Sequence, residues 1–295
     1  MSSAGTREQT ATPFHPPGWA GVSTCALDAG LPPPLPWRPS FHVLLLATAG
    51  HGTVEIDFVR HACRPGTLLW VRPGQELRVG DDGLAAAVVT FDSGLNNRGL
   101  AQAGPPVDGV APPRPAAVAR WQLEGEDEDA IISEFTQLAV DCERHVAGPL
   151  AAELLRHQLT VLLLRIALLS GAEESGAESH TYARFRRLLE AGHPRSRRVE
   201  DYAEKLNCSV RTLTRACLAV TGRTAKQVVD DRVTLEARRL LACTAMSVAE
   251  VGRHLGFLEP TNFGRFFHRE VGISPGQFRA EAAPRLVPGQ RPPPD

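Results

Sequence analysis

The chain has 295 residues, a hydrophobic fraction of 43%, a charged fraction of 22% and a formal net charge of -1. This length exceeds the usual size of one globular core, so we expect two domains. The longest strongly apolar stretch, residues 161–169, is too short to span a bilayer, and the N-terminus lacks the basic start and apolar run of a secretory signal. We therefore expect a cytoplasmic protein with no membrane partner.

The charged residues divide the chain into two parts. Residues 181–282 contain 18 Lys and Arg against 11 Asp and Glu, which gives +7, whereas residues 1–180 contain 12 against 21, which gives -9. A basic part beside an acidic part indicates that one domain binds a polyanion, although a chance distribution of surface charge gives the same pattern. The six cysteines form no close pair, so neither a disulfide framework nor a zinc cluster is predicted.

The first half of the chain has the texture of an antiparallel β domain. Residues 1–40 are rich in proline and show neither a helical nor a strand period, so an extended arm is predicted there. From Phe41 onward, short apolar or alternating runs are separated by turn residues, and a last strand is expected at 117–123 after a Pro/Gly-rich loop at 103–115. Closely spaced short strands predict a barrel or sandwich over residues 41–125.

A helical connector is predicted over residues 126–170. After the acidic run 126–129, the hydrophobic period indicates helices at 130–145 and 149–169. Apolar residues on the second helix recur at intervals of 4, 3, 4 and 3, namely Leu155, Leu159, Leu162, Ile166 and Leu169. This stripe suits either packing against the barrel of the same chain or a contact between two subunits. The polar segment 171–180 is expected to be the linker between the domains.

Residues 181–282 are predicted to be helical and to contain an internal repeat at an offset of about 50 residues. Ala203 precedes Asn207 by four residues, and Gly252 precedes Gly256 by the same interval. The first residue of each pair must be small because another helix crosses it, and the second tolerates the left-handed backbone that ends a helix. Five further pairs match at an offset of 50: Leu213 with Phe263, Arg215 with Arg265, Gly222 with Gly272, Thr224 with Ser274, and Gln227 with Gln277.

The helix after each turn begins with a capping or first-turn residue, Ser209 in one copy and Pro260 in the other. A long amphipathic helix through residues 229–241 can hold the two copies in a fixed relation. Ser247 and Glu250 then form a capping box for the next helix. Two helix-turn-helix units joined by one long helix are therefore predicted.

These residues resemble the AraC/XylS family. The stretch RTLTR...VTG...DDRVTLEARRLL...SVAEVGRHLGF...TNFGRFFHREVGISPGQFR is similar to the tandem helix-turn-helix domain of that family along its whole length. The resemblance implies a transcriptional regulator that places helices 209–220 and 260–270 in successive major grooves of double-stranded DNA, about 34 Å apart. Cys217 departs from the family pattern where an aromatic is usual, which affects local packing. Pro260 replaces a frequent polar residue and removes one possible base contact.

The resemblance also implies which side chains reach the DNA. The expected contacts are Arg211, Thr214, Arg215, Thr261, Asn262 and Arg265. The arginine fork matches two acceptors on a guanine edge, whereas threonine and asparagine contact bases or phosphates or remain solvated. A second set of arginines is expected to contact phosphates: Arg186, Arg187, Arg195, Arg197 and Arg198.

Strands 41–91, with their PGxL...PGQ rhythm, resemble the cupin-like sensor domain common in the family. The resemblance implies that the barrel encloses a small-molecule effector, and the alternative is a barrel filled by its own side chains that serves only in assembly. A metal-dependent enzyme is the rival class, but His42, His51 and His61 are scattered and Leu77 stands where related segments often carry histidine. No catalytic residue, metal or cofactor is therefore predicted.

The expected fold is α+β with two domains. A cupin-like antiparallel β-barrel with a helical connector precedes an all-α domain of two helix-turn-helix units over residues 181–282, and residues 283–295 form a proline-rich tail. The expected partners are double-stranded DNA, a small-molecule effector, RNA polymerase and a second copy of the chain.

Overall fold

The computed structural model describes Gly18 and residues 20–27, 36–80, 83–92, 119–144, 148–169, 177–193 and 196–282. The chain divides into two compact units, Met1–Ala172 and Glu173–Asp295, and the division falls within the expected linker 171–180. Within the described ranges, no helix is long and apolar enough to cross a membrane. The predicted loop 103–115 and the tail 283–295 lie outside the described residues.

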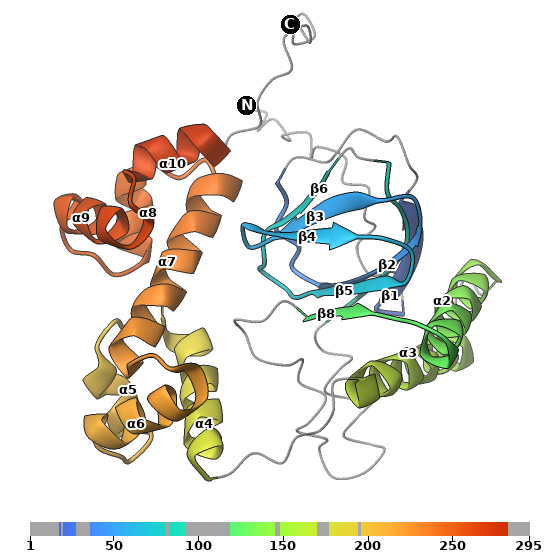
Figure 1. The fold of residues 1–295 in the computed structure, drawn as a ribbon, viewed down its shortest axis with the longest axis horizontal. Helices are drawn as coiled ribbons and strands as arrows, with labels where there is room; N and C mark the ends of the chain where they lie inside the picture. The colour runs from blue at the N-terminus through green and yellow to red at the C-terminus, as the bar shows by residue number, and fades with distance from the viewer. Residues whose placement is uncertain are drawn as a thin grey trace, which may run out of the picture. The chain divides into compact units, whose positions relative to one another are not determined.

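The first unit contains two antiparallel sheets (Figure 1). One sheet has the order β1-β7-β2-β5-β8, and the other has the order β4-β3-β6. The strands are β1 (Val22–Leu27), β2 (His42–Ala49), β3 (Gly52–Ile56), β4 (Val59–Cys63), β5 (Thr67–Val71), β6 (Leu77–Val79), β7 (Ala85–Phe91) and β8 (Ala119–Gln122). The antiparallel β domain and its last strand, β8, are thus found where the sequence predicts them.

Strand β2 is buried on both faces because each face meets a different layer. Val43 and Leu45 belong to a core cluster shared with residues of the second sheet. Leu44 and Leu46 point the other way and pack with residues of the connector helices. Successive side chains of a strand point to opposite faces, so a strand between two layers needs a continuous apolar run, here VLLLA.

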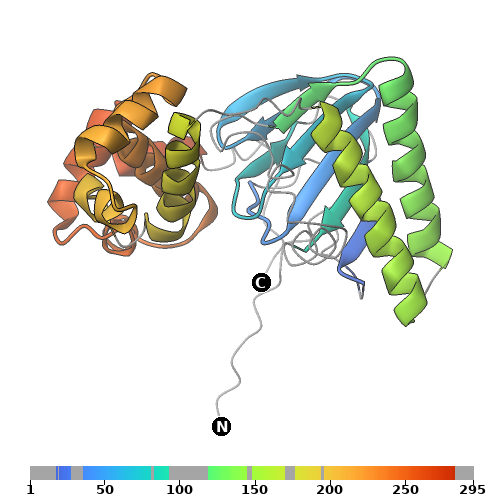
Figure 2. The same cartoon turned by 90° about the horizontal axis from the view of Figure 1, so that it is seen from below.

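The connector helices are α2 (Glu126–Arg144) and α3 (Pro149–Leu169), which lie side by side along the five-stranded sheet (Figure 2). Helix α2 begins four residues earlier than predicted. Its first turn consists of the acidic run Glu126 to Asp129, and carboxylates at a helix N-terminus are stabilised by the helix dipole. The acidic run therefore starts the helix and does not precede it.

The apolar stripe on α3 packs within its own chain. Leu155, Leu159, Leu162 and Ile166 are buried and belong to one core cluster with residues of the five-stranded sheet and α2. Leu169 is partly buried against the same cluster. The stripe is therefore core, and the hypothesis that it is a subunit contact is wrong.

Residues 22–27 correct the prediction that segment 1–40 contains no strand. They form β1, which pairs antiparallel with β7 in the register Val22 with Phe91 through Leu27 with Ala86. The strand was missed because only its ends are buried, so its sequence VSTCAL shows no alternation. Backbone hydrogen bonds to β7 define it. The first domain therefore begins before Phe41.

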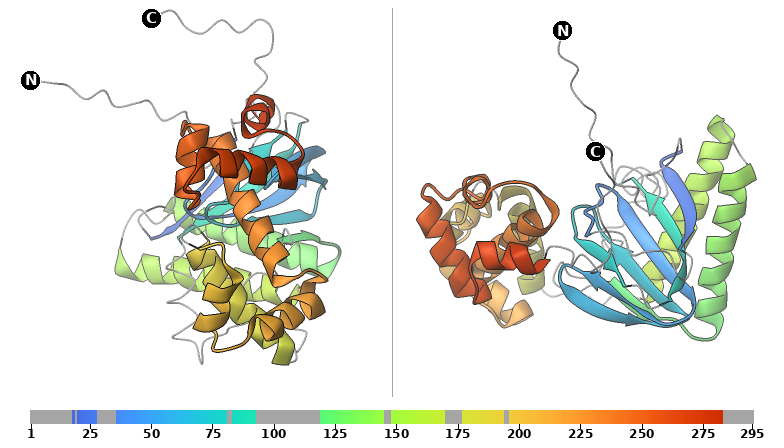
Figure 3. Two further views of the ribbon diagram at one scale, coloured as in Figure 1. Left: turned by 90° about the vertical axis from the view of Figure 1, so that its left-hand side faces the viewer. Right: turned by 90° about the horizontal axis from the view of Figure 1, so that it is seen from above.

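The second unit is all helical. Its helices are α4 (Ala177–Gly192), α5 (Val199–Lys205), α6 (Val210–Thr221), α7 (Ala225–Cys243), α8 (Val248–His254), α9 (Pro260–Val271) and α10 (Pro275–Ala282). Helix α4 starts within the predicted linker, because its first residues include Ala177 and Glu178, which are strong helix formers. The long helix α7 runs from α4–α6 to α8–α10 (Figure 3).

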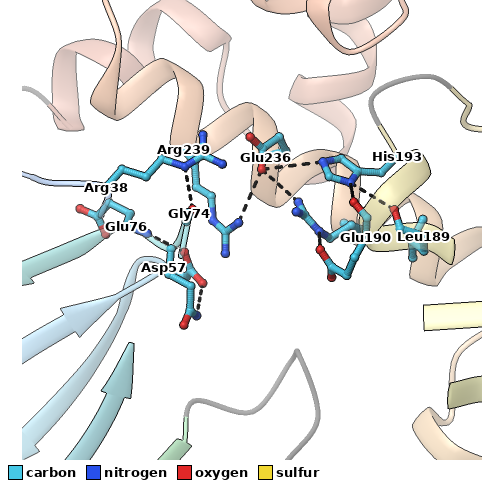
Figure 4. Close-up of polar contacts among 11 residues, drawn as sticks. Arg38, Asp57, Gly74, Glu76, Leu189, Glu190, His193, Glu236 and Arg239 are labelled. Atoms are coloured by element: carbon cyan, nitrogen blue, oxygen red, sulfur yellow. Dashed lines mark hydrogen bonds and ion pairs between the residues drawn. The ribbon is translucent and has the colours of Figure 1, made fainter. Parts of the chain in front are cut away.

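An ionic network attaches α4 to α7 (Figure 4). Arg232 Nε lies 2.8 Å from Glu190 Oε2, and its Nη1 lies 3.2 Å from Glu236 Oε2. Glu236 Oε2 also lies 3.8 Å from Nε2 of the buried His193. Burial, reinforced by the Arg232 charge, lowers the pKa of His193. The network orients the first helix of the unit on α7.

Candidate nucleic-acid interface

The turns α5–α6 and α8–α9 have the same backbone geometry. Asn207 and Gly256 both lie in the left-handed region, with φ of 51° and 74°. The next amide reaches back five residues in each turn, from Cys208 to the Ala203 carbonyl at 3.0 Å and from Phe257 to the Gly252 carbonyl at 2.9 Å. These bonds satisfy carbonyls that the end of a helix leaves unpaired. The two predicted turns are confirmed.

Gly252, the small residue of the α8–α9 turn, lies close against α9. A Cβ placed on Gly252 would come 3.0 Å from Cβ and 3.1 Å from Cγ of Phe263, so α8 and α9 approach too closely there for a larger residue. The first helix-turn-helix has Ala203 and Leu213 at the equivalent positions. Alanine, which is larger than glycine, is thus paired with leucine, which is smaller than phenylalanine.

The pairs that match at an offset of 50 residues are mainly helix caps. Gly222 and Gly272 end α6 and α9 in left-handed conformations, with φ of 68° and 86°. Thr224 and Gln227 form a capping box at the start of α7. Ser274 and Gln277 form the same reciprocal bonds before α10, at 2.9 and 3.2 Å. The repeat therefore encodes the ends of the helices as well as their faces.

The starts of α6 and α9 differ as the sequence predicts. The Ser209 side chain caps α6 by accepting from the Thr212 amide at 3.1 Å. Helix α9 has Glu259 as its N-cap without a side-chain cap bond, and Pro260 occupies its first turn. Proline suits this position because its missing N–H would have no partner there.

The two recognition helices α6 and α9 expose and bury equivalent positions. Leu213, Ala216 and Cys217 are buried in α6, and Phe263, Phe266 and Phe267 are buried in α9. Arg211, Arg215, Thr261, Asn262 and Arg265 are exposed, and Thr214 is half-buried. The structure therefore places five of the six expected contacts on the surface.

Cys217 occupies the core position that Phe267 fills in the second helix-turn-helix. It is completely buried, and this burial raises the pKa of its thiol to about 12. The side chain is an interior apolar group, and the departure from the usual aromatic is accommodated in the core.

The expected phosphate contacts have different environments. Arg187 and Arg198 are exposed, and Arg186 is half-buried. Arg195 lies outside the described residues. The guanidinium carbon of Arg197 lies 3.6 Å from the centroid of the Phe257 ring, and its Nη2 donates to the Gly256 carbonyl at 3.2 Å. Arg197 thus contacts the turn between α8 and α9.

A groove between α7 and α9 was not predicted from the sequence. It has a volume of about 940 Å³ and is lined by basic residues together with Asp230 and Glu270; the basic residues are Arg197, Arg223, Lys226, Arg265 and Arg269. Lys226 Nζ lies 2.5 Å from Asp230 Oδ1, and Arg269 lies 3.5 Å from the same carboxylate. Sequence spacing gave no sign of this groove because its basic residues come from distant segments.

The first unit places its histidines apart. His42 is buried, accepts from Trp70 Nε1 at its Nδ1 at 3.1 Å, and stacks on Phe91 with ring centroids 4.7 Å apart. His51 is exposed, and His61 lies on β4. In the described part of the chain, no three His, Cys, Asp or Glu side chains gather as a metal site requires. Leu77 is buried in the cluster between the sheets.

Comparison with known proteins gives two family matches. Residues 28–159 match the AraC-like ligand binding domain, and residues 202–281 match a helix-turn-helix domain. The chain belongs to the AraC family of transcriptional regulators. The transcriptional activator RhaS of Salmonella agona is 28% identical over 81% of this chain and 85% of its own length, and RhaS of Enterobacter sp. (strain 638) is 29% identical over 50% of this chain and 52% of its own.

The similar solved structures include other regulators. ToxT from Vibrio cholerae O395 is 12% identical, covers 90% of this chain and 99% of its own, and has a TM-score of 0.49. The DNA-binding domain of AdpA, solved with a target DNA, is 32% identical over 36% of this chain and 93% of its own, with a TM-score of 0.31. The RhaS relatives are transcriptional activators and not enzymes.

Proposed function

We propose that this AraC-family chain reads two half-sites about one helical turn apart, one with α6 and one with α9. The observation that carries the proposal is the shared pattern of exposure on the two helices. Arg211, Thr214 and Arg215 serve the first half-site. Thr261, Asn262 and Arg265 serve the second. The exposed Arg187 and Arg198 contact phosphates, and the protein works in the cytoplasm on chromosomal DNA without a catalytic role.

Selection from a random duplex library with the full chain tests this proposal. The expected result is a pair of half-sites whose centres lie about 10 base pairs apart, because α6 and α9 then meet the same face of the duplex. Recovery of one isolated half-site, or of no sequence, would contradict it. The selected duplex placed upstream of a promoter then tests whether the chain activates RNA polymerase, which we propose as its protein partner.

The first domain is proposed to bind a small-molecule effector, and its match to the AraC-like ligand binding domain supports this. One observation favours the alternative of a domain that serves only assembly: residues of both sheets, among them Val43, Val54 and Val71, are completely buried in a single cluster. Native mass spectrometry of the purified chain, followed by a thermal-shift screen of small metabolites, separates the two. A compound that stabilises the first domain and changes operator affinity supports the effector.

We also infer that the chain forms a dimer through the outer face of α3, which the sequence analysis did not identify. Leu150 and Leu168 are 85% and 82% exposed, and Leu154, Val161 and Leu164 are exposed between them. Together with His157, these residues recur at intervals of 4, 3, 4, 3 and 4, which is the spacing of a paired-helix seam. The seam lies apart from the buried stripe on the same helix.

The outer seam is self-complementary when two copies pair antiparallel. Reversing the helix about position 159 sets Leu150 against Leu168 of the partner subunit, and Leu154 against Leu164 of the partner subunit. The same register sets Glu153 opposite the partner subunit's Arg165, so opposite charges flank the seam. A two-fold dimer requires such a patch, in which each residue meets its counterpart in reverse order.

A further inference from the structure

The two helix-turn-helix units, the first built on α5 and α6 and the second on α8 and α9, have little direct contact with each other. Among the described helices, α5 and α6 pack on α7, as do α8, α9 and α10, while pairs made of one helix from each unit share at most marginal contact. Helix α7 has 19 residues, which corresponds to a length of about 28 Å. The packing of both units on this one helix sets their relation, and a side-chain contact that joins the units directly would restrain their relative rotation further.

Arg197 supplies such a contact, because its backbone is held in the first helix-turn-helix unit and its guanidinium in the second. Its backbone belongs to the segment before α5, where the neighbouring Ser196 carbonyl accepts from the Tyr202 hydroxyl at 2.8 Å and the Ser196 hydroxyl donates to Asp201. Its guanidinium lies over Phe257 and donates to Gly256, which form the turn between α8 and α9. The side chain therefore spans from the first helix-turn-helix unit to the second.

The contact leads directly to the second recognition helix. The Phe257 ring meets Phe263 with ring centroids 5.3 Å apart and Phe266 with centroids 5.2 Å apart, and both belong to the buried face of α9. A cation over an aromatic face and a charge-assisted hydrogen bond are each directional. A shift of α9 relative to the first helix-turn-helix unit would break both the cation–π contact and the hydrogen bond of Arg197.

We propose that Arg197 is a positioning residue that fixes the spacing and rotation between the two half-sites that α6 and α9 read. This inference rests on the proposed function, because it concerns the relation between the two sites. It replaces the expectation that Arg197 contacts a phosphate. Its neighbour Arg198 is a matched control, since it is 76% exposed and its carboxylate partner Glu200 lies 3.8 Å away.

The experiment measures the affinity of the full chain for the operator selected by the wild-type protein and for duplexes whose half-sites are moved by one base pair in either direction. One base pair changes the distance by about 3.4 Å and the rotation by about 35°. We expect Arg197→Ala to bind the selected operator about tenfold more weakly and to lose most of the preference for that spacing. Arg198→Ala, which removes a proposed phosphate contact, should weaken binding to all spacings alike and keep the wild-type preference.

Phe257→Leu provides a second test that keeps the Arg197 charge. It removes the ring under the guanidinium and should also flatten the spacing preference, whereas a phosphate-binding Arg197 would leave that preference unchanged. Circular dichroism tests whether each variant is folded. If Arg197→Ala is not folded, the wild-type chain is compared with Phe257→Leu instead. A wild-type spacing preference in the folded variants overturns the proposal, as does an equal loss on operator and random DNA. A wild-type chain that selects no operator contradicts the proposed function itself.

Discussion

Gly252 and Phe263 are in contact across the second helix-turn-helix, where a Cβ on the glycine would lie 3.0 Å from Cβ of the completely buried phenylalanine. The first helix-turn-helix has Ala203 and Leu213 at these places. The turn thus requires a small residue whose permitted size depends on the side chain above it. This requirement comes from packing, because the left-handed residue of the turn is four positions further on.

Gly252→Ala is expected to destabilise the second helix-turn-helix by about 1–2 kcal/mol, because overpacking outweighs the better helix propensity of alanine. In a Phe263→Leu background the same change should cost less, since the pair then matches Ala203 and Leu213. Chemical denaturation followed by circular dichroism measures both. Gly264→Ala is the control: a Cβ there meets nothing within 4 Å, so this variant should be slightly more stable. An equal penalty in both backgrounds would refute the contact.

Arg265→Ala should weaken binding to the selected operator by about 1–3 kcal/mol, because an arginine fork that reads a guanine edge contributes about this much discrimination. Binding to random duplex should change much less. Fluorescence anisotropy with both duplexes measures the difference. Equal losses on the two duplexes would assign Arg265 to the DNA backbone.

The affinity of the full chain for its operator should fall steeply with salt, by about tenfold or more from about 50 mM to about 200 mM, because phosphate contacts release counterions. The basic residues around α6, α9 and the α7–α9 groove support this expectation. The acidic first half does not cancel it, since the effect depends on local contacts. A flat titration would contradict the electrostatic part of the proposal.

The helix-turn-helix units were predictable because their signals are local. Ser209, Asn207 and Gly222 each act within one turn of chain, and the repeat at an offset of 50 doubled each signal. Long-range features were not accessible in this way. Strand β1 exists through its pairing with β7, and the contact of Arg197 with Phe257 joins residues 60 positions apart in the sequence.

Which face of helix α3 is buried was likewise not predictable from the sequence. Its sequence carries two apolar stripes, and only the position of the sheet and of α2 decides which one is buried. The stripe with the more regular leucine pattern is core, and the outer seam includes His157 and is less obvious in sequence. Amphipathic periodicity identifies a helix well, but it does not identify the partner of each face.

Protonation of His42 in the unfolded chain should reduce the stability of the first domain as the pH falls below 6.5, whereas Glu76, whose pKa burial raises to about 7, contributes in the opposite direction. Burial, reinforced by the Arg72 charge, lowers the pKa of His42 from 6.5 to about 4. The unfolded chain protonates His42 below pH 6.5 while the native domain does not, so the contribution of this residue to the free energy of unfolding decreases toward acid. At pH 5 the loss from this residue is about 2 kcal/mol relative to pH 7.5.

Urea unfolding of wild type and His42→Gln at the two pH values measures this effect. Tryptophan fluorescence reports the first domain alone, because all four tryptophans precede residue 172. The variant loses stability at both pH values through the Trp70 contact, but its deficit relative to wild type should be smaller at pH 5 than at pH 7.5 by the His42 contribution. Parallel pH dependences would show that His42 is protonated in the native domain.

Charges introduced into the outer seam of α3 should prevent the chain from forming a dimer. The double variant Leu154→Glu, Val161→Glu should be a folded monomer, because both positions are 41% exposed in the single chain and a carboxylate buried at a subunit contact is costly. Leu159→Glu is the matched comparison on the same helix: its side chain is 2% exposed in the core, so this variant should unfold the first domain. Sedimentation velocity gives the oligomeric state, and circular dichroism with tryptophan fluorescence reports folding. A wild-type chain that dimerises together with a folded double variant that also dimerises would place the subunit contact elsewhere, whereas a double variant that unfolds would mean that this face is needed within the single chain.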